Sequence, residues 1–326
     1  MPKLIDPFGR KITYLRVSLT DRCNMRCFYC LPRDFRDFQE KENLLKDDQL
    51  LRVIAAFGEL GVSRFRLTGG EPLIRPQVSR LVADLSAIPG VEDLSMSTNA
   101  SLLEKYAVAL KQAGLNRINV SLDSLDPEKF LKVTGGRLEP VLEGLQAAKE
   151  AGISPIKINM LAMRGINDDE VEDMVLFCLE NGFTLRFIET MPMGTSGLTG
   201  SDHYLPLSII RAQLESRFEL IPTVMKGNGP ARYVQVKGSD LKIGFITPIS
   251  QHFCETCNRV RLTADGTLYL CLGQENSYPL GSLLKRGISD EGLKNSIREA
   301  LLLKPLKHDF VTQPGRQTRI MSITGG

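Results

Sequence analysis

The sequence of 326 residues contains no tryptophan and only three histidines, His203, His252 and His308. A metal site built mainly of histidines, or a relay of histidine acid–base catalysts, is therefore not expected. No apolar run reaches the roughly 18 residues that a membrane-spanning helix needs. Residues 1–10 also lack the apolar core of a signal peptide. These absences predict a cytoplasmic protein with no membrane partner.

The chain has no large excess of either charge, because 41 Lys and Arg face 38 Asp and Glu, which gives a net charge of +3. This balance excludes an acidic tail and a histone-like polycation. Basic residues are not interleaved with aromatic residues, so nucleic acid is not an expected partner. The length fits two domains, or one large domain with an appendage.

Strand-like and helix-like segments alternate over the first two thirds of the chain. We predict strands at residues 12–19, 64–68, 91–97, 116–122, 154–161 and 183–189, and helices at 47–60, 74–88, 102–113, 140–151 and 168–181. Six such units in a row predict a parallel sheet, either open or closed into a barrel. Polar residues directly follow every strand, and only a barrel brings all of these ends to one site. The pattern therefore favours an α/β fold with a partial (β/α)6 TIM-like barrel.

The pattern changes after residue 205. One more helix is predicted at residues 206–218, then short strands at 233–236, 242–245, 259–263 and 267–270, and a late helix at 290–303. Glycine and proline are frequent in residues 226–230, which is typical of a linker. We therefore expect a barrel domain over residues 1–225 and a smaller C-terminal α+β domain over 226–326.

The seven cysteines are the most informative residues, and their odd number argues against a disulfide framework. Cys178 stands alone in a helical pattern and is expected to be a small buried apolar residue. Cys23, Cys27 and Cys30 form a first triad with the spacing CxxxCxxC. Structural zinc usually takes four protein ligands, whereas a four-iron cluster held by three cysteines keeps one iron open for a substrate. Half of a zinc ribbon is the alternative.

Cys254, Cys257 and Cys271 form a second triad. His252 lies two residues before Cys254 and could complete a zinc site, although a residue so close to Cys254 would need an awkward path to the same metal. A second three-cysteine iron–sulfur cluster is the other interpretation. It is favoured if the first triad holds such a cluster.

Cations lie at or near the strand ends, which indicates a polyanionic ligand. The five residues concerned are Arg16, Arg66, Lys157, Arg259 and Arg261. Arg259 and Arg261 alternate along a predicted strand, so both side chains should face one side. Arginine forks fit phosphate oxygens in a bidentate geometry. In addition, residues 69–72 (Gly-Gly-Glu-Pro) follow a strand, where glycine allows the backbone to approach a ligand closely.

The first triad, with Tyr29 before its last cysteine, resembles the radical S-adenosylmethionine (SAM) superfamily. The segment 253–272, Arg16 before the first triad, the Gly-Gly-Glu-Pro segment and the terminal Gly325-Gly326 together resemble the GTP 3′,8-cyclase family, which starts molybdenum cofactor biosynthesis. The resemblance implies two [4Fe–4S] clusters, SAM as co-substrate, and cyclisation of GTP to (8S)-3′,8-cyclo-7,8-dihydro-GTP. It also implies an electron donor of unknown identity, a cyclic pyranopterin monophosphate synthase that receives the product, and a homodimer.

The resemblance also implies a role for individual residues. The first cluster would be held by Cys23, Cys27 and Cys30, and the second by Cys254, Cys257 and Cys271. SAM would be bound by Tyr29, Gly70, Glu71, Ser121 and Met191. GTP would be bound by Arg16, Arg66, Ser97, Lys157, Arg259, Val260 and Arg261. Gly325 and Gly326 would reach the active site and support catalysis, whereas the simplest alternative is a frayed terminus.

Two further functions compete with this one. A radical SAM enzyme that modifies a peptide would also carry an auxiliary cluster, but such enzymes usually have more C-terminal cysteines. The other competing function is a binding module that is stabilised by zinc and is not an enzyme. Iron content separates these hypotheses, because two four-iron clusters require about eight irons per chain.

Overall fold

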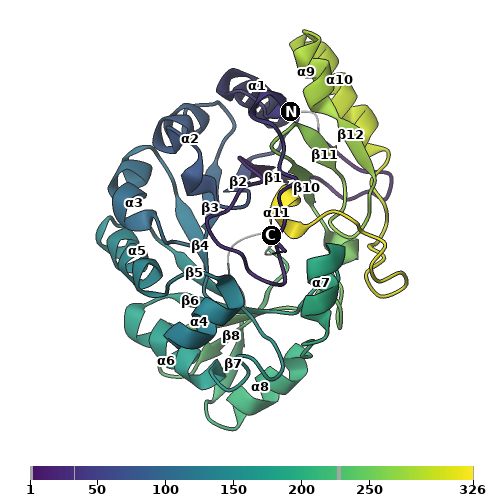
Figure 1. Cartoon of the computed structure of the whole chain (residues 1–326). Coiled ribbons are helices and arrows are strands. Elements are labelled where there is room, and N and C mark those ends of the chain that lie inside the picture. The colour runs from purple at the N-terminus through teal and green to yellow at the C-terminus, as the bar shows by residue number, and fades with distance from the viewer. Residues whose placement is uncertain (1–2, 33, 226–228, 326) are drawn as a thin grey trace.

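The computed structural model describes residues 3–32, 34–225 and 229–325 (Figure 1). Its twelve strands are β1 (Tyr14–Ser18), β2 (Arg64–Thr68), β3 (Asp93–Thr98), β4 (Arg117–Ser121), β5 (Ile156–Leu161), β6 (Thr184–Ile188), β7 (Leu220–Thr223), β8 (Arg232–Val236), β9 (Lys242–Ile246), β10 (Arg259–Leu262), β11 (Thr267–Tyr269) and β12 (Ser277–Pro279). Its eleven α-helices are α1 (Asp47–Glu59), α2 (Val78–Ser86), α3 (Leu103–Gln112), α4 (Pro127–Thr134), α5 (Glu139–Glu150), α6 (Val171–Asn181), α7 (Gly194–Ser201), α8 (Leu207–Glu215), α9 (Leu280–Lys285), α10 (Asp290–Leu301) and α11 (Met321–Thr324). None of these helices is long and apolar enough to cross a bilayer.

The six predicted βα strands lie side by side in chain order, from β1 to β6, and every neighbouring pair is parallel. They form an arc with α1, α2, α3, α5 and α6 along its outer side (Figure 1). This arrangement confirms the predicted partial barrel.

Two strands from the C-terminal part of the chain extend the same sheet. β10 pairs in parallel with β1, and β9 pairs in parallel with β6. Antiparallel strands follow at both ends, so the order is β12-β11-β10-β1-β2-β3-β4-β5-β6-β9-β8-β7. Residues 226–228 of the predicted linker lie outside the described residues, and the division at residue 225 stays a prediction.

The helices that the sequence predicts begin and end close to the predicted residues, with one exception; α4, α7, α9 and α11 were not predicted. In α1 the expected apolar face, including Leu50, Val53 and Phe57, is buried, and Gly61 follows the helix with a φ of +87°. The helix expected from residue 74, by contrast, begins only at Val78. Pro76 has no N–H to continue a helix, and Pro72–Ile74 forms a separate 3-10 turn.

Alternation along the strands divides the side chains between a core and the barrel interior. In β1, Leu15 and Val17 are fully buried in the apolar core, whereas Arg16 between them lines a cavity on the other face. The core lies between the outer face of the sheet and the helices that cover it. The inner face is therefore available for polar and charged side chains.

Candidate active site

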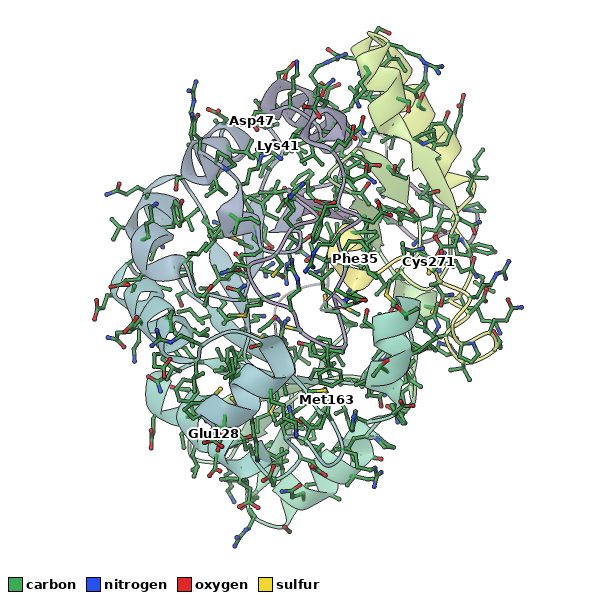
Figure 2. The ribbon with its side chains drawn as sticks, in the orientation of Figure 1. Phe35, Lys41, Asp47, Glu128, Met163 and Cys271 are labelled. Atoms are coloured by element: carbon green, nitrogen blue, oxygen red, sulfur yellow. The ribbon has the colours of Figure 1, made fainter. Side chains whose placement is uncertain are left out.

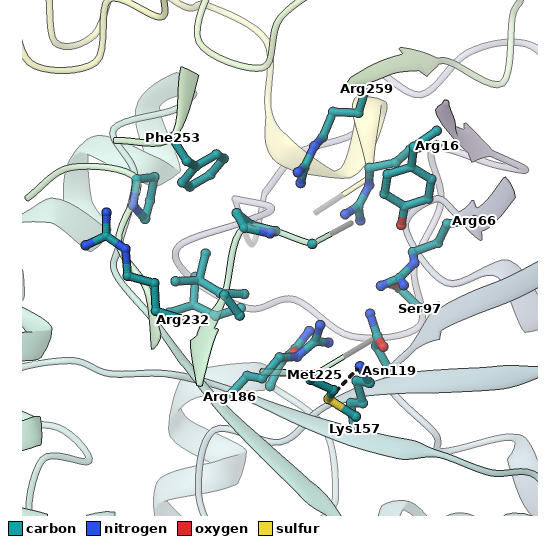
Figure 3. Close-up of a pocket in the computed structure, with 18 of the residues that line it drawn as sticks. Arg16, Arg66, Ser97, Asn119, Lys157, Arg186, Met225, Arg232, Phe253 and Arg259 are labelled. Atoms are coloured by element: carbon teal, nitrogen blue, oxygen red, sulfur yellow. Dashed lines mark hydrogen bonds between the residues drawn. The ribbon is translucent and has the colours of Figure 1, made fainter. Parts of the chain in front are cut away.

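The interior of the barrel contains a cavity of about 510 Å³. Its described lining includes nine cations and no carboxylate; the cations are Arg16, Arg64, Arg66, Arg117, Lys157, Arg186, Arg232, Arg259 and Arg261. Figure 3 shows several of them pointing toward one another from different strands. We call this cavity the cationic pocket. All five of the cations that the sequence singled out line it.

Strand register places the arginines in two neighbouring rows. In one row Arg16 lies between Arg261 and Arg66 on the flanking strands. In the next row Tyr14 lies between Arg259 and Arg64. Arg259 and Arg261 therefore face the same side of β10, as the sequence predicts. Val260, also predicted to contact GTP, has its side chain in the apolar core.

The cations lower one another's affinity for protons. Burial and the nearby Arg261 hold the pKa of Arg16 well below its usual range. Burial lowers the pKa of Arg66 and of Arg261 to about 10, and burial with the charge of Arg186 lowers the pKa of Lys157 to about 7. A low pKa here means that positive charge is crowded without a counter-charge. A polyanion would supply that counter-charge.

Several polar atoms of the pocket lack a partner within the described structure. They include Nε and Nη2 of Arg16, the same two atoms of Arg186, and Oδ1 of Asn119 and Asn159. Buried polar groups are nearly always hydrogen-bonded, so such atoms mark places where a ligand binds. The unpaired guanidinium groups suit phosphate oxygens, and the amide oxygens suit hydroxyl or amino groups.

Sequence reasoning missed four cations of the pocket. These are Arg64, Arg117, Arg186 and Arg232. Three of them lie on the predicted strands β2, β4 and β6, at positions that alternate with buried apolar residues. For these three arginines, alternation with buried apolar residues was a signal in the sequence that their side chains face the barrel interior. Arg232 lies at the start of β8 and reaches the pocket through the pairing of β8 with β9.

The first cysteine triad lies on the loop that follows β1. The unpredicted helix α4 holds this loop, because the backbone N–H groups of Arg26 and Phe28 donate to the carbonyls of Thr134 (2.7 Å) and Val133 (3.1 Å). Burial raises the pKa of Cys23 to about 11 and that of Cys30 to about 12. As free thiols both would therefore be neutral.

The Gly-Gly-Glu segment packs against the same loop. A Cβ on Gly70 would lie 2.1 Å from the carbonyl oxygen of Arg22, so only glycine fits there. Glu71 is buried and accepts from the Thr98 hydroxyl at 2.7 Å and the Asn99 backbone N–H at 2.7 Å. Burial raises its pKa to about 7. The segment thus braces the cysteine loop, and its contact with SAM stays a prediction.

The other predicted SAM residues lie near this loop or beside the pocket. The Tyr29 hydroxyl donates to Oδ2 of Asp123 at 2.5 Å, and burial raises the pKa of Asp123 to about 6. Ser121 is exposed at the end of β4. Met191 lines the cationic pocket and packs in a small apolar cluster with Cys30 and Leu272. Ser97, predicted for GTP, lines the pocket as expected.

The second triad lies at the other side of the pocket. Cys254 begins a 3-10 turn, the Cys257 N–H donates to the Cys254 carbonyl at 3.1 Å, and Cys271 follows β11. Phe253 and Leu272, next to two of these cysteines, line the pocket. His252 is exposed. Among the described residues no group of three or more His, Cys, Asp or Glu is placed closely enough to hold a single metal ion, and this holds for zinc and iron alike.

The C-terminal tail runs between the two triads. Arg319 pairs with Glu275 at 2.6 Å and donates to the Cys271 carbonyl at 3.1 Å, and Figure 2 labels Cys271 beside the yellow C-terminal segment. Beyond it, α11 lies inside the arc of strands (Figure 1). A backbone hydrogen bond from Ser322 reaches Cys30. The tail is therefore anchored as far as Gly325, whereas Gly326 lies outside the described residues.

The cysteines of each triad are close enough to influence one another's charge. Burial and the neighbouring Cys30 raise the pKa of Cys27 well above its usual value. In the second triad burial raises the pKa of Cys271, Lys304 opposes the rise, and the neighbouring Cys257 and Cys254 add to it. Three soft thiol ligands on each loop are the donor set of a site-differentiated iron–sulfur cluster. Both triads fit such a group.

Comparisons with known proteins agree with this geometry. Residues 17–178 match the family model of the radical SAM superfamily, and residues 183–310 match that of Molybdenum Cofactor Synthesis C. A GTP 3′,8-cyclase of Hydrogenovibrio crunogenus is 51% identical over 312 residues, 94% of each chain. Those of Mesorhizobium japonicum and Petrotoga mobilis are 46% and 42% identical, and at least 99% of each chain is covered.

Solved structures share the fold at much lower identity. Streptococcus suis SuiB bound to S-adenosylmethionine superposes with a TM-score of 0.61 at 16% identity, covering 91% of this chain and 73% of SuiB. SuiB bound to the precursor peptide SuiA gives a TM-score of 0.62 at 16% identity, with 96% and 76% covered. By its near-full-length identity to the curated relatives, the chain belongs to the GTP 3′,8-cyclase family of the radical SAM superfamily.

Proposed function

We propose that this chain converts GTP into (8S)-3′,8-cyclo-7,8-dihydro-GTP, the first step of molybdenum cofactor biosynthesis. SAM is the co-substrate, and 5′-deoxyadenosine and methionine are by-products. The observation that carries the proposal is the cationic pocket, whose described lining has nine cations and no carboxylate and which borders the second triad. A pocket of this charge suits a nucleoside triphosphate better than a peptide.

Two [4Fe–4S] clusters belong to this proposal, one on each triad. Cys23, Cys27 and Cys30 would hold the first cluster, which when bound would supply the electron for reductive cleavage of SAM. C3′ of the GTP ribose would be the site of hydrogen abstraction. Tyr29, Gly70, Glu71, Ser121 and Met191 bind SAM beside that triad. Cys254, Cys257 and Cys271, whose sequence neighbours Phe253 and Leu272 line the cationic pocket, would hold the second cluster on the GTP side.

The remaining residues of the site orient GTP. Arg16, Arg66 and Arg261, in one row, bind phosphate oxygens through guanidinium nitrogens, and Arg259 and Lys157 add charge to the same pocket. Ser97 and Val260 are the other predicted GTP contacts. The buried Oδ1 atoms of Asn119 and Asn159 accept hydrogen bonds from hydroxyl or amino groups of the nucleoside.

Isotope transfer tests the proposal directly. Anaerobically reconstituted protein is incubated with SAM, dithionite and GTP deuterated at C3′, and both products are measured by mass spectrometry. The expected result is deuterium in 5′-deoxyadenosine together with a cyclised nucleotide. Neither should form with the Cys27→Ala variant. Release of unlabelled 5′-deoxyadenosine without cyclised GTP would argue for a different substrate.

The resemblance makes two further predictions that stand apart from the chemistry. One is that the product passes to a cyclic pyranopterin monophosphate synthase. The other is that the chain forms a homodimer. Both stay predictions.

A further inference from the structure

A buried lysine outside the cationic pocket contacts the second triad. Lys304, just after α10, is only 3% exposed. Its Nζ donates to the carbonyl of Leu270 at 2.6 Å and to that of Arg259 at 3.0 Å. The same Nζ lies 3.7 Å from Sγ of Cys257. An ammonium group has three N–H bonds, so these three contacts use all of them.

The ammonium group lacks a carboxylate partner in the part of the chain that the structure describes. None of the ion pairs found there contains Lys304, and the nearby Asp6 is engaged by Nε of Arg10 at 2.5 Å. A buried charge is strongly unfavourable unless an opposite charge compensates it. Two groups able to do so are the sulfur of Cys257, 3.7 Å from Nζ, and that of Cys271, whose charge also acts on the lysine. They compensate the lysine only as thiolates, the form in which cysteine binds a metal.

The contacts of Lys304 also join the two chain segments that carry these cysteines. The Arg259 carbonyl lies two residues after Cys257, and the Leu270 carbonyl belongs to the residue before Cys271. Arg10 supports the third cysteine from the N-terminal side, since its Nη1 donates to the Cys254 carbonyl at 2.8 Å. Arg259 also lines the cationic pocket. A displacement of Lys304 would therefore displace residues of both the second triad and the cationic pocket.

We propose that Lys304 is a positioning residue for the second triad. Its ammonium group balances the thiolate charge and donates a hydrogen bond to Sγ of Cys257. Both interactions stabilise the iron–sulfur cluster bound there, and they stabilise its reduced, more negative form most. This inference rests on the proposed function, because it presupposes a cluster on Cys254, Cys257 and Cys271. Hydrogen bonds to cluster sulfurs and nearby charges are known to set reduction potentials.

The test compares four full-length chains that all carry Cys27→Ala, so that only the second cluster contributes to the signal. These are the parent, Lys304→Met, Lys304→Gln and Lys304→Arg. Lys307→Met is the matched control, because Lys307 is exposed and three residues away. Reduction potential is measured by EPR-monitored titration, and cluster stability by the rate of iron loss to a chelator. Thermal melting reports folding.

Lys304→Met should shift the potential to more negative values and accelerate iron loss. Removing an outer-shell partner usually lowers metal affinity about 10- to 100-fold, and we expect an increase of the same order in the rate of iron loss. Lys304→Gln retains a donor for the carbonyls but no charge, and should show the same shift in potential. The potential and the rate of iron loss of Lys304→Arg should be closer to those of the parent, and those of Lys307→Met should equal them. If Lys304→Met does not fold, Lys304→Gln decides the result.

Unchanged potential and iron loss in both uncharged variants would overturn the inference while leaving the proposed function intact. A parent protein that holds no second cluster would overturn the two-cluster proposal, and this inference with it. The two failures are therefore distinguished by the iron content of the parent, about four per chain if the second cluster is present.

Discussion

Nη1 of Arg261 donates a hydrogen bond to the carbonyl oxygen of Gly325 at 3.1 Å. Arg261 lines the cationic pocket, so this bond connects the C-terminal tail to the group that would meet the substrate. Gly325 has a φ of +70°, and a Cβ there would lie 2.0 Å from Oγ1 of Thr68. The tail can reach Arg261 in this way only because residue 325 is glycine.

Gly325→Ala should therefore displace the tail from Arg261. We expect formation of cyclised GTP to fall by about 100-fold, the scale of loss when catalytic geometry shifts by an ångström. SAM cleavage in the absence of cyclisation should remain measurable. Both are quantified as product and as 5′-deoxyadenosine in the same reaction.

Gly287→Ala is the matched control, because Gly287 has a φ of +77° but, apart from its own neighbours in the chain, no atom of the described residues lies within 4 Å of the position that a Cβ would take. It should cost about 1–2 kcal/mol of stability through backbone strain alone and leave the product rate unchanged. A full rate of product formation from Gly325→Ala, or from a chain that lacks residues 325–326, would show that the tail has no role in catalysis.

Arg186→Met should weaken GTP binding. Two of its guanidinium nitrogens are buried and have no partner in the described structure, so they are available for phosphate. Loss of a charge-assisted hydrogen bond costs about 1.5–3 kcal/mol, and guanosine affinity should change much less. Isothermal titration calorimetry under argon measures both. Arg211→Met is the control, since it removes an exposed ion pair with Glu215 and should alter neither affinity. Equal losses of GTP and guanosine affinity in Arg186→Met would contradict a phosphate role for Arg186.

Lys157 should make GTP binding depend on pH. Burial, with the charges of Arg186 and Arg117, lowers its pKa to about 7, so above pH 7 the free protein holds mostly neutral lysine. A triphosphate favours the ammonium form, so binding takes up a proton and affinity falls as the pH rises from 7 to 9. Calorimetry in buffers of different ionisation enthalpy measures this uptake. It should be absent in Lys157→Gln, and an identical uptake in that variant would assign it to another group.

Cys257→Ala should halve the iron content, from about eight to about four per chain. The first triad is untouched, so some uncoupled release of 5′-deoxyadenosine should survive while cyclisation is lost. Cys178→Ala is the control, since Cys178 is fully buried in α6 and far in sequence from both triads. It should lower stability by about 1 kcal/mol with full iron content. Loss of SAM cleavage with retained cyclisation in Cys257→Ala would reverse the two roles.

Much of the barrel could be predicted from the sequence because local patterns dictate it. The apolar spacing of α1 and the short apolar strands β1 to β6 need no knowledge of distant residues. The cysteine spacing of the first triad and the alternation of Arg259 and Arg261 are local in the same sense. These features led to the fold class, to six cysteines and to five of the nine cations in the described lining of the pocket.

Other elements have no local pattern that predicts them. Helix α7 contains three glycines, and the close approach of Gly200 to Tyr29, where a Cβ would lie 2.9 Å from that of Tyr29, gives these glycines a packing role. Helix α11 has only four residues, too few to be stable alone. Both are stabilised by tertiary contacts near the cysteine loops.

The sequence by itself determined which residue types are present and which strand faces they occupy. Only the tertiary structure decided that residues 244 positions apart, Arg10 and Cys254, would touch, and that β10 would pair with β1 to complete a row of arginines. The reason is physical: periodicity fixes the direction of a side chain relative to its own strand, whereas the closing of the arc decides which side chains meet. Lys304 shows this most clearly, since nothing near it in sequence indicates that its charge lies against a cysteine sulfur.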